Sequence, residues 1–166
     1  MASKKGLIVT ITILAGITGA SFLLWVIPQD YEATFVVSDY KGYLDGVQNI
    51  HEVLEESMDM EYQNLRTGKI TPQEYIAITE VTSTQVTAQI SEFVTSKPPE
   101  EWQASYINYM DAMKKFNSYI IEMKILANLI ENGSTEDEMK ETLEKIELLK
   151  MESAELVKAS QQSRPD

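Results

Sequence analysis

The sequence predicts an all-α protein in which one N-terminal transmembrane helix is followed by an extracytoplasmic antiparallel four-helix bundle. Three observations lead to this prediction. Residues 6–27 are apolar and uncharged, all 26 acidic residues lie after them, and the rest divides into four long stretches with helical spacing of apolar side chains. The predicted organisation is a cytoplasmic tail (1–5), a transmembrane helix (6–27), a linker (28–38), the bundle (39–160) and a frayed tail (161–166).

The apolar segment over residues 6–27 is long enough to cross a membrane. As a helix it spans about 33 Å, which matches a hydrocarbon core of about 30 Å. Lys4 and Lys5 precede the segment, whereas Asp30 and Glu32 follow it. Because basic flanks stay on the cytoplasmic side, we expect the N-terminus inside the cell membrane and the bundle outside it.

Two other interpretations of this segment stay open. Residues 18–20 (TGA) before Ser21 form a small-residue pattern that a signal peptidase accepts, although cleavage there would leave residues 22–27 as an apolar stub. Residues 4–6 (KKG) resemble the leader of type IV pilin-like proteins, which are cut after such a glycine. The chain departs from that pattern at Ile11, where a glutamate is typical, and it lacks the expected strand-rich head.

The first predicted helix runs from about Asp39 to Thr67. Ser38 is placed to cap its N-terminus, and Gly68 is placed to end it. Apolar side chains recur every three or four residues along one face, which predicts that this face is buried. The face comprises Tyr40, Leu44, Val47, His51, Leu54, Met58 and Leu65.

The second predicted helix opens with a capping box and runs to about Thr95. Thr71 is the cap, Pro72 occupies the first helical position and Glu74 the third. Its interior is rich in β-branched residues, which lower helix propensity. They include Thr79, Val81, Thr82, Thr84, Val86 and Thr87. A helix is still favoured, because strand-like alternation is absent.

The third and fourth predicted helices are separated by residues 132–133 (NG). The third begins after residues 98–99 (PP), and its heptad series predicts the centre of the core: Trp102, Tyr106, Tyr109, Met113, Phe116, Ile120, Met123, Ala127 and Ile130. The fourth covers about Glu136 to Ser160 after a second capping box, with Met139, Leu143, Ile146, Leu149, Leu156 and Val157 inward. Because all connections are short, neighbouring helices must run antiparallel.

Charge and composition exclude several classes of function. The chain has a net charge of −12 and a pI near 4.5. A protein this acidic is repelled by the phosphate backbone of nucleic acids, so we expect no nucleic-acid partner. The absence of cysteine excludes disulfides, zinc–thiolate sites, covalent haem attachment and a thiol nucleophile. The bundle must therefore be stabilised by its packed core.

No catalytic or metal-binding constellation is readable from the sequence, so we expect no enzyme activity, no metal and no cofactor. A ferritin-like site needs two Glu-x-x-His pairs, but His51 is the only histidine and Gln48 precedes it by three residues. A hydrogen-bonded core residue is the favoured interpretation of His51, and ligation of a non-covalent haem is the alternative. Met58 and Met60 lie about 200° apart around a helix, so they cannot share one copper ion.

The predicted transmembrane helix carries small residues on one face. Thr12, Gly16 and Ala20 recur at four-residue spacing, with Ala15 and Gly19 beside them. Such a pattern lets another helix approach closely and predicts a docking face for other membrane protein subunits. The alternative is the ordinary composition of a membrane helix.

The predicted loop between the third and fourth helices contains an acceptor pattern for an N-linked glycan. It consists of Asn132, Gly133 and Ser134, and it would lie on the outer side of the membrane. Modification of Asn132 is one interpretation. The other is that these residues only end one helix and begin the next.

Residues 14–18 (LAGIT) and 25–29 (WVIPQ) of the stem resemble the anchors of small proteins from ammonia-oxidising archaea. The layout, with a short basic tail, one outward-pointing stem and a cysteine-free acidic helical domain, is similar to small accessory subunits of the archaeal membrane ammonia monooxygenase. This resemblance includes no catalytic motif, so it transfers no site residues. It implies a structural role beside catalytic subunits that carry the copper.

The sequence therefore predicts a non-catalytic, single-pass accessory subunit of a larger membrane complex. Its partners would be the lipid bilayer and other membrane protein subunits. The alternative is a free-standing cell-surface module that binds a ligand or a protein partner through its helical bundle.

Overall fold

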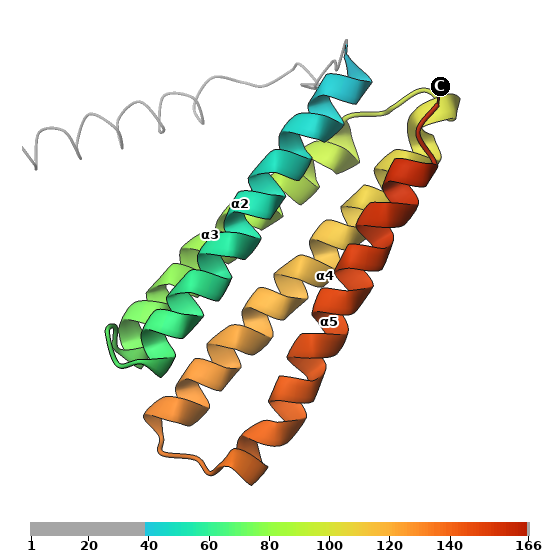
Figure 1. The fold of residues 1–166 in the computed structure, drawn as a ribbon. Coiled ribbons are helices and arrows are strands. Elements are labelled where there is room, and N and C mark those ends of the chain that lie inside the picture. The colour runs from blue at the N-terminus through green and yellow to red at the C-terminus, as the bar shows by residue number, and fades with distance from the viewer. Residues whose placement is uncertain (1–38, 166) are drawn as a thin grey trace, which may run out of the picture. The chain divides into compact units, whose positions relative to one another are not determined.

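The computed structural model describes residues 39–165, which fold into a four-helix, all-α bundle (Figure 1). The helices are α2 (Tyr40–Arg66), α3 (Pro72–Thr95), α4 (Glu100–Glu131) and α5 (Glu136–Gln162). Within the described part of the chain, none of these helices is long and apolar enough to cross a membrane. The predicted cytoplasmic tail (1–5), transmembrane helix (6–27) and linker (28–38) all lie outside the described residues.

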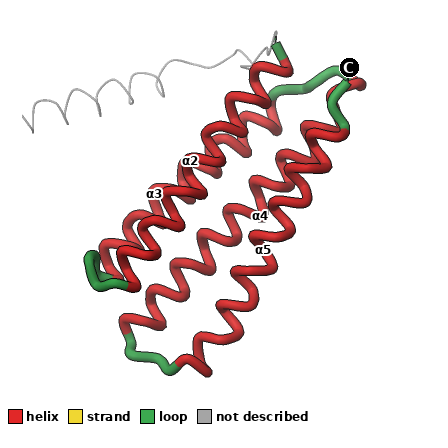
Figure 2. Tube along the Cα trace, in the orientation of Figure 1, coloured by secondary structure: helices red, strands yellow, loops and turns green. Residues whose placement is uncertain are grey.

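Short loops join the consecutive helices, which run in alternating directions (Figure 2). The loops cover residues 67–71, 96–99 and 132–135, so each helix returns beside the one before it. The helix bounds agree closely with the predicted stretches. The largest difference is at the end of α5, which continues to Gln162, so the first residues of the predicted frayed tail are helical.

Both predicted capping boxes are present. The Thr71 hydroxyl accepts a hydrogen bond from the Glu74 N–H at 3.2 Å, and the Glu74 carboxylate accepts one from the Thr71 N–H at 2.8 Å. Thr135 and Glu138 repeat this arrangement at 3.4 and 2.7 Å. The backbone N–H bonds that these carboxylates accept lower the pKa of both Glu74 and Glu138.

The N-terminus of α2 differs from the prediction, because its cap is Asp39 and not Ser38. The Asp39 carboxylate accepts a hydrogen bond from the Gly42 N–H at 2.8 Å. In this arrangement the Asp39 carboxylate occupies the place that a Cβ atom at position 42 would take. At the other end of α2, and after α4, Gly68 and Gly133 adopt φ angles of +70° and +72°, which confirms both as helix stops.

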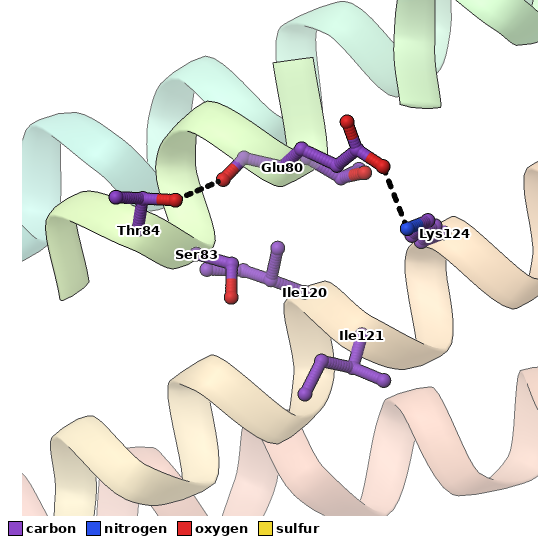
Figure 3. A pocket seen from close by; sticks show the side chains of 7 residues that line it. Glu80, Ser83, Thr84, Ile120, Ile121 and Lys124 are labelled. Carbon is purple, nitrogen blue, oxygen red and sulfur yellow. Dashed lines mark hydrogen bonds and ion pairs between the residues drawn. The ribbon is translucent and has the colours of Figure 1, made fainter. Parts of the chain in front are cut away.

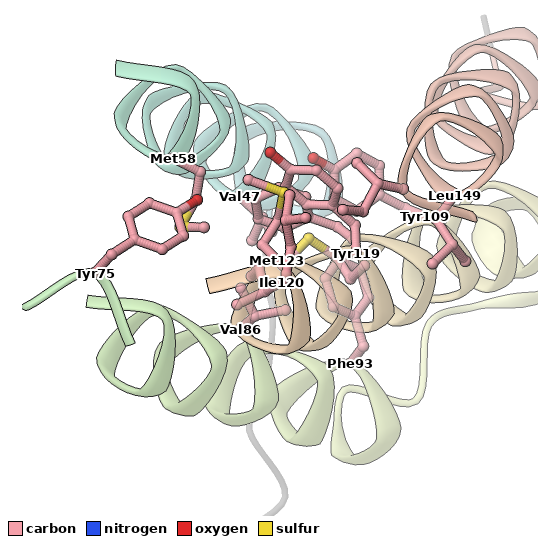
Figure 4. Packing of buried hydrophobic residues seen from close by; sticks show 14 of the residues in the cluster. Val47, Met58, Tyr75, Val86, Phe93, Tyr109, Tyr119, Ile120, Met123 and Leu149 are labelled. Atoms are coloured by element: carbon pink, nitrogen blue, oxygen red, sulfur yellow. The ribbon is translucent and has the colours of Figure 1, made fainter. Parts of the chain in front are cut away.

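Helix α4 is the centre of the core (Figure 4). Seven of the nine residues in its predicted heptad series are buried, and Trp102 and Ile130 are partly buried. Further buried positions extend around the helix, namely Ser105, Ala112, Tyr119, Glu122 and Leu126. These positions fall outside one heptad seam because α4 packs against both α3 and α5. The predicted inward stripe of α2 is likewise confirmed, with His51 buried among its apolar members.

Small residues bring α4 and α5 together. The hydroxyl of Ser105 donates to the Ser160 carbonyl at 2.9 Å, and the Ser160 hydroxyl donates to the Ser105 carbonyl at 2.8 Å. Farther along, Ser153 donates to the Ala112 carbonyl at 3.0 Å. Side chains this short reach the backbone of the neighbouring helix only where the two helices approach closely. We call these four residues the α4–α5 seam.

The predicted inward face of α5 was only partly right. Ile146 and Leu149 are buried, whereas Leu143 keeps 37% of its surface exposed. The buried serines of the seam, which the sequence prediction missed, occupy part of the inward face instead. A count of apolar residues alone does not identify a helix contact that is built from hydroxyl groups and backbone carbonyls.

Candidate functional site

The charges of the bundle are distributed unevenly among its helices. Helix α3 carries three charged residues in 24, namely Glu74, Glu80 and Glu92, whereas α5 carries twelve in 27. Exposed helix faces usually carry charged side chains, because charged groups are strongly hydrated. The outer side of α3 therefore differs from the rest of the bundle surface, and it is the first candidate for a contact with another protein.

Six of the exposed residues of α3 form an uncharged stripe, and the exposed Glu74, Glu80 and Glu92 border it. We call this stripe the α3 face, and it comprises Ala77, Val81, Thr84, Ala88, Ser91 and Thr95. All six residues are exposed, and Val81 keeps 59% of its surface accessible. Val94, at the edge of this face, is 66% exposed. The surface thus offers methyl groups and small side chains in place of charges.

The hydroxyl groups of the α3 face are satisfied within the helix itself. Thr84 donates to the Glu80 carbonyl at 2.9 Å, and Ser91 donates to the Thr87 carbonyl at 3.0 Å. Thr95 donates to the Ser91 and Glu92 carbonyls at 3.2 and 3.0 Å. Because these donors already have partners, covering the face would strand none of the three hydroxyl groups.

A groove of about 450 Å³ runs between α3 and α4 beside this face (Figure 3). Its lining residues are Thr79, Glu80, Ser83, Thr84, Ile120, Ile121 and Lys124. An ion pair of 2.7 Å joins Glu80 to Lys124 at one side, and Ser83 donates to Asn117 at 2.7 Å. Ile121 and Ile125 of α4 remain 47% and 42% exposed. The groove therefore connects the α3 face to exposed Ile121 of α4, with the Glu80–Lys124 ion pair beside it.

His51 lies in the core and shares a hydrogen bond with a tyrosine. Its Nδ1 atom is 3.2 Å from the Tyr109 hydroxyl oxygen, and its ring lies 4.4 Å from the ring centre of Phe116. Only 4% of its surface is exposed. Burial disfavours the charged imidazolium and lowers the pKa of His51 to about 4. His51 is thus a buried residue with a hydrogen bond to Tyr109, and its Nε2 atom is buried without a hydrogen-bond partner in the described chain.

A small cleft of about 180 Å³ adjoins His51 between α2 and α5. It is lined by Gln48, His51, Glu52, Glu55, Tyr109, Ser153, Ala154 and Val157. Burial raises the pKa of Glu55, and the nearby Lys150 opposes this rise. Within residues 39–165 there is no group of three or more histidine or acidic side chains placed to hold a metal ion.

Ion pairs connect α2 to α5 across this side of the bundle. The Lys150 ammonium lies 2.9 Å from the Asp59 carboxylate, which also accepts a hydrogen bond from the Tyr119 hydroxyl at 3.2 Å. Arg164, after α5, pairs with Asp45 near the start of α2. These contacts join α2 to α5, so the charges involved are paired within the bundle.

The residues singled out in the sequence lie apart in the structure. Met58 is buried, whereas Met60 is 57% exposed, so the two sulfur atoms face different environments. Asn132 is exposed at the C-terminal end of α4. The predicted docking face of the anchor lies outside the described residues, and its members are Thr12, Ala15, Gly16, Gly19 and Ala20.

The sequence prediction missed the α3 face. The β-branched residues of α3 predict a low helix propensity, but two further signals in the sequence mark the face. The six residues follow one another at spacings of four, three, four, three and four, and none of them is charged.

Comparison of the chain with protein-family models, with curated proteins and with solved structures finds no match.

Proposed function

We propose that this chain is a non-catalytic accessory subunit of a larger membrane complex. Residues 6–27 anchor it in the cell membrane, the N-terminus lies in the cytoplasm, and the four-helix bundle stands on the outer side. The resemblance of the stem and layout makes the archaeal membrane ammonia monooxygenase the candidate complex. In this role the chain supports catalytic subunits and carries no reactive group of its own.

The observation that carries the proposal is the uncharged α3 face. In a chain of net charge −12, a contact with another protein costs least where no charge must leave water. The α3 face meets this condition from Ala77 to Thr95, and the hydroxyl groups of Thr84, Ser91 and Thr95 are already satisfied. Such a surface suits a protein neighbour better than it suits open solvent.

The anchor supplies the second contact of the proposed subunit. Small residues at positions 12, 16 and 20 let a neighbouring transmembrane helix approach closely, with positions 15 and 19 beside them. We expect Gly16→Leu with Ala20→Leu to release the chain from its complex and to leave its helicity unchanged. Ser21→Leu is the matched control, because helical spacing places it opposite Thr12.

Native-size analysis after extraction in mild detergent tests the proposal. A subunit migrates far above its own mass of 18.8 kDa, and mass spectrometry of that species identifies other membrane proteins. A species that contains only this chain would contradict the proposal. That result would favour a free-standing cell-surface module, which binds a ligand or a partner through the bundle.

A further inference from the structure

A second groove lies at the end of the bundle where α3 turns into α4. Its volume is about 310 Å³, and we call it the end groove. Most of its lining is apolar or aromatic, namely Phe93, Pro98, Tyr106, Ile107 and Met110. Phe93 and Tyr106 are buried, whereas Ile107 keeps 53% of its surface exposed. The described chain therefore leaves an apolar surface open to water at this end.

An apolar occupant would strand no polar group in the end groove. Among the described residues that line it, only Lys97 is charged, and its side chain is exposed. The stem of a lysine can lie along an apolar surface while its ammonium stays in water. The Tyr106 hydroxyl already donates to the Tyr40 carbonyl at 3.2 Å. The groove therefore suits apolar side chains that carry no charge.

The start of α2 lies at the same end of the bundle (Figure 1). Tyr40 is the first residue of this helix, and its ring lies 6.3 Å from the Trp102 ring. Tyr106 connects the two places, because it lines the end groove and bonds to the Tyr40 carbonyl. The chain that precedes α2 therefore joins the bundle one tyrosine side chain away from the groove.

The chain just before α2 contains an apolar run. Residues 35–37 (FVV) are apolar, whereas residues 28–34 (PQDYEAT) include two carboxylates. Phe35 precedes Tyr40 by five residues, so an extended chain can carry it up to about 17 Å from Tyr40. Side chains of this kind gain free energy when they leave water. The run therefore has both the chemistry and the reach to fill the end groove.

Covalent connection favours this run over an occupant from another molecule. A short tether gives the run an effective concentration on the order of 1 mM at the groove. An intramolecular contact also avoids most of the entropy that two separate molecules lose on association. The run brings no charge with it. Two successive valines favour an extended backbone, in which neighbouring side chains point to opposite sides.

We infer that the end groove binds residues 35–37 of the same chain, with Phe35 inserted in the groove and Val36 facing away from it. This contact needs neither a membrane nor a partner protein, so it does not rest on the proposed function. It leaves residues 28–34 as the free part of the predicted linker between the anchor and the bundle.

Cysteine labelling of the purified full chain in mild detergent tests this inference, because the chain has no cysteine of its own. Ile107→Cys should react with a maleimide about tenfold more slowly than Ala104→Cys, since labelling follows the fraction of time that the groove is open. Ala104 is exposed on α4 and does not line the groove. Each rate is divided by the rate of the same variant after unfolding.

Two substitutions in the run identify what covers the groove. Phe35→Asp should release the run, because it would bury a carboxylate in an apolar site, and the Ile107→Cys rate should rise to that of Ala104→Cys. Val36→Asp is the matched control and should leave the Ile107→Cys rate low. Fast labelling of Ile107→Cys with Phe35 intact would overturn the inference. Slow labelling that persists with Phe35→Asp, or equal acceleration by Val36→Asp, would also overturn it.

Cross-linking within one chain provides a second measurement. We expect a short bismaleimide to join Phe35→Cys to Ile107→Cys, with the product at the mass of a single chain. Ile121→Cys in place of Ile107→Cys is the control, since Ile121 is 47% exposed and lies fourteen residues, about 21 Å, farther along α4. Equal cross-linking of the two pairs, or none with Ile107→Cys, would contradict the contact. Both measurements use the isolated chain, so their outcome is independent of whether the chain belongs to a larger complex.

Discussion

The α4–α5 seam and the α3 face use similar residues in opposite ways. In the seam, serine hydroxyls bond to the backbone of a neighbouring helix, as Ser105 and Ser160 do at 2.8–2.9 Å. On the α3 face, Thr84 and Ser91 bond to carbonyls of their own helix. The difference shows that a hydroxyl group crosses to another helix only where that helix lies within reach. The α4–α5 seam therefore indicates how another helix could pack on the α3 face.

The largest expected effect comes from enlarging an alanine in each region. Ala112 is fully buried in the seam, so Ala112→Leu must push α4 and α5 apart and should cost about 3 kcal/mol of unfolding free energy. Ala88→Leu on the exposed α3 face should change stability by less than about 0.5 kcal/mol. Urea unfolding of the two full-length variants measures this difference. Equal losses would show that the two regions are not distinct.

The buried His51 in the core predicts that the stability of the bundle depends on pH. The pKa of His51 is about 4 in the folded chain and about 6.5 when it is exposed, so the unfolded chain binds the proton first as the pH falls. Stability is therefore lost between pH 6.5 and 4, and the loss from His51 should reach about 2 kcal/mol at pH 5.

His51→Phe provides the measurement. Its unfolding free energy should fall between pH 7 and pH 5 by about 2 kcal/mol less than that of the unmodified chain. The variant retains the acidic residues, so their titration is common to both proteins. Identical pH profiles would mean that His51 is protonated equally in the folded and unfolded states.

The smallest expected effect comes from deleting single hydroxyl groups. Ser160→Ala removes the bond from its hydroxyl to the Ser105 carbonyl and should cost about 1 kcal/mol. Thr84→Ala removes a bond within one helix and replaces a β-branched residue by the best helix former, so stability should change by less than about 0.5 kcal/mol. A loss at Thr84 as large as that at Ser160 would contradict the comparison.

Local signals in the sequence predicted much of the fold. The capping boxes at Thr71 and Thr135 depend on residues three positions apart, so they could be read directly and were confirmed. The periodic stripes of α2 and α4 were predictable for the same reason, because one helix face repeats at fixed spacing. The cap of α2 was wrong by one residue, since both Ser38 and Asp39 are suitable capping residues.

The contacts between helices could not be predicted in the same way. Ser105, Ser153 and Ser160 are polar, and only the arrangement of α4 beside α5 makes them buried residues. Tyr119 falls outside the single heptad seam and is buried because two helices flank α4. The α3 face consists of residues that α3 does not bury. These residues can be identified only after the buried face of α3 is known.

Accessibility of the α3 face in native membranes tests the central claim most directly. The reaction of Ala88→Cys with a membrane-impermeant maleimide should be much slower than that of Ala104→Cys in intact membranes, and the two rates should become equal once the protein is unfolded. Both positions are exposed on the isolated bundle, so protein that covers the α3 face accounts for slow labelling. Equal labelling rates in intact membranes would show that the α3 face is open to water and would contradict the account.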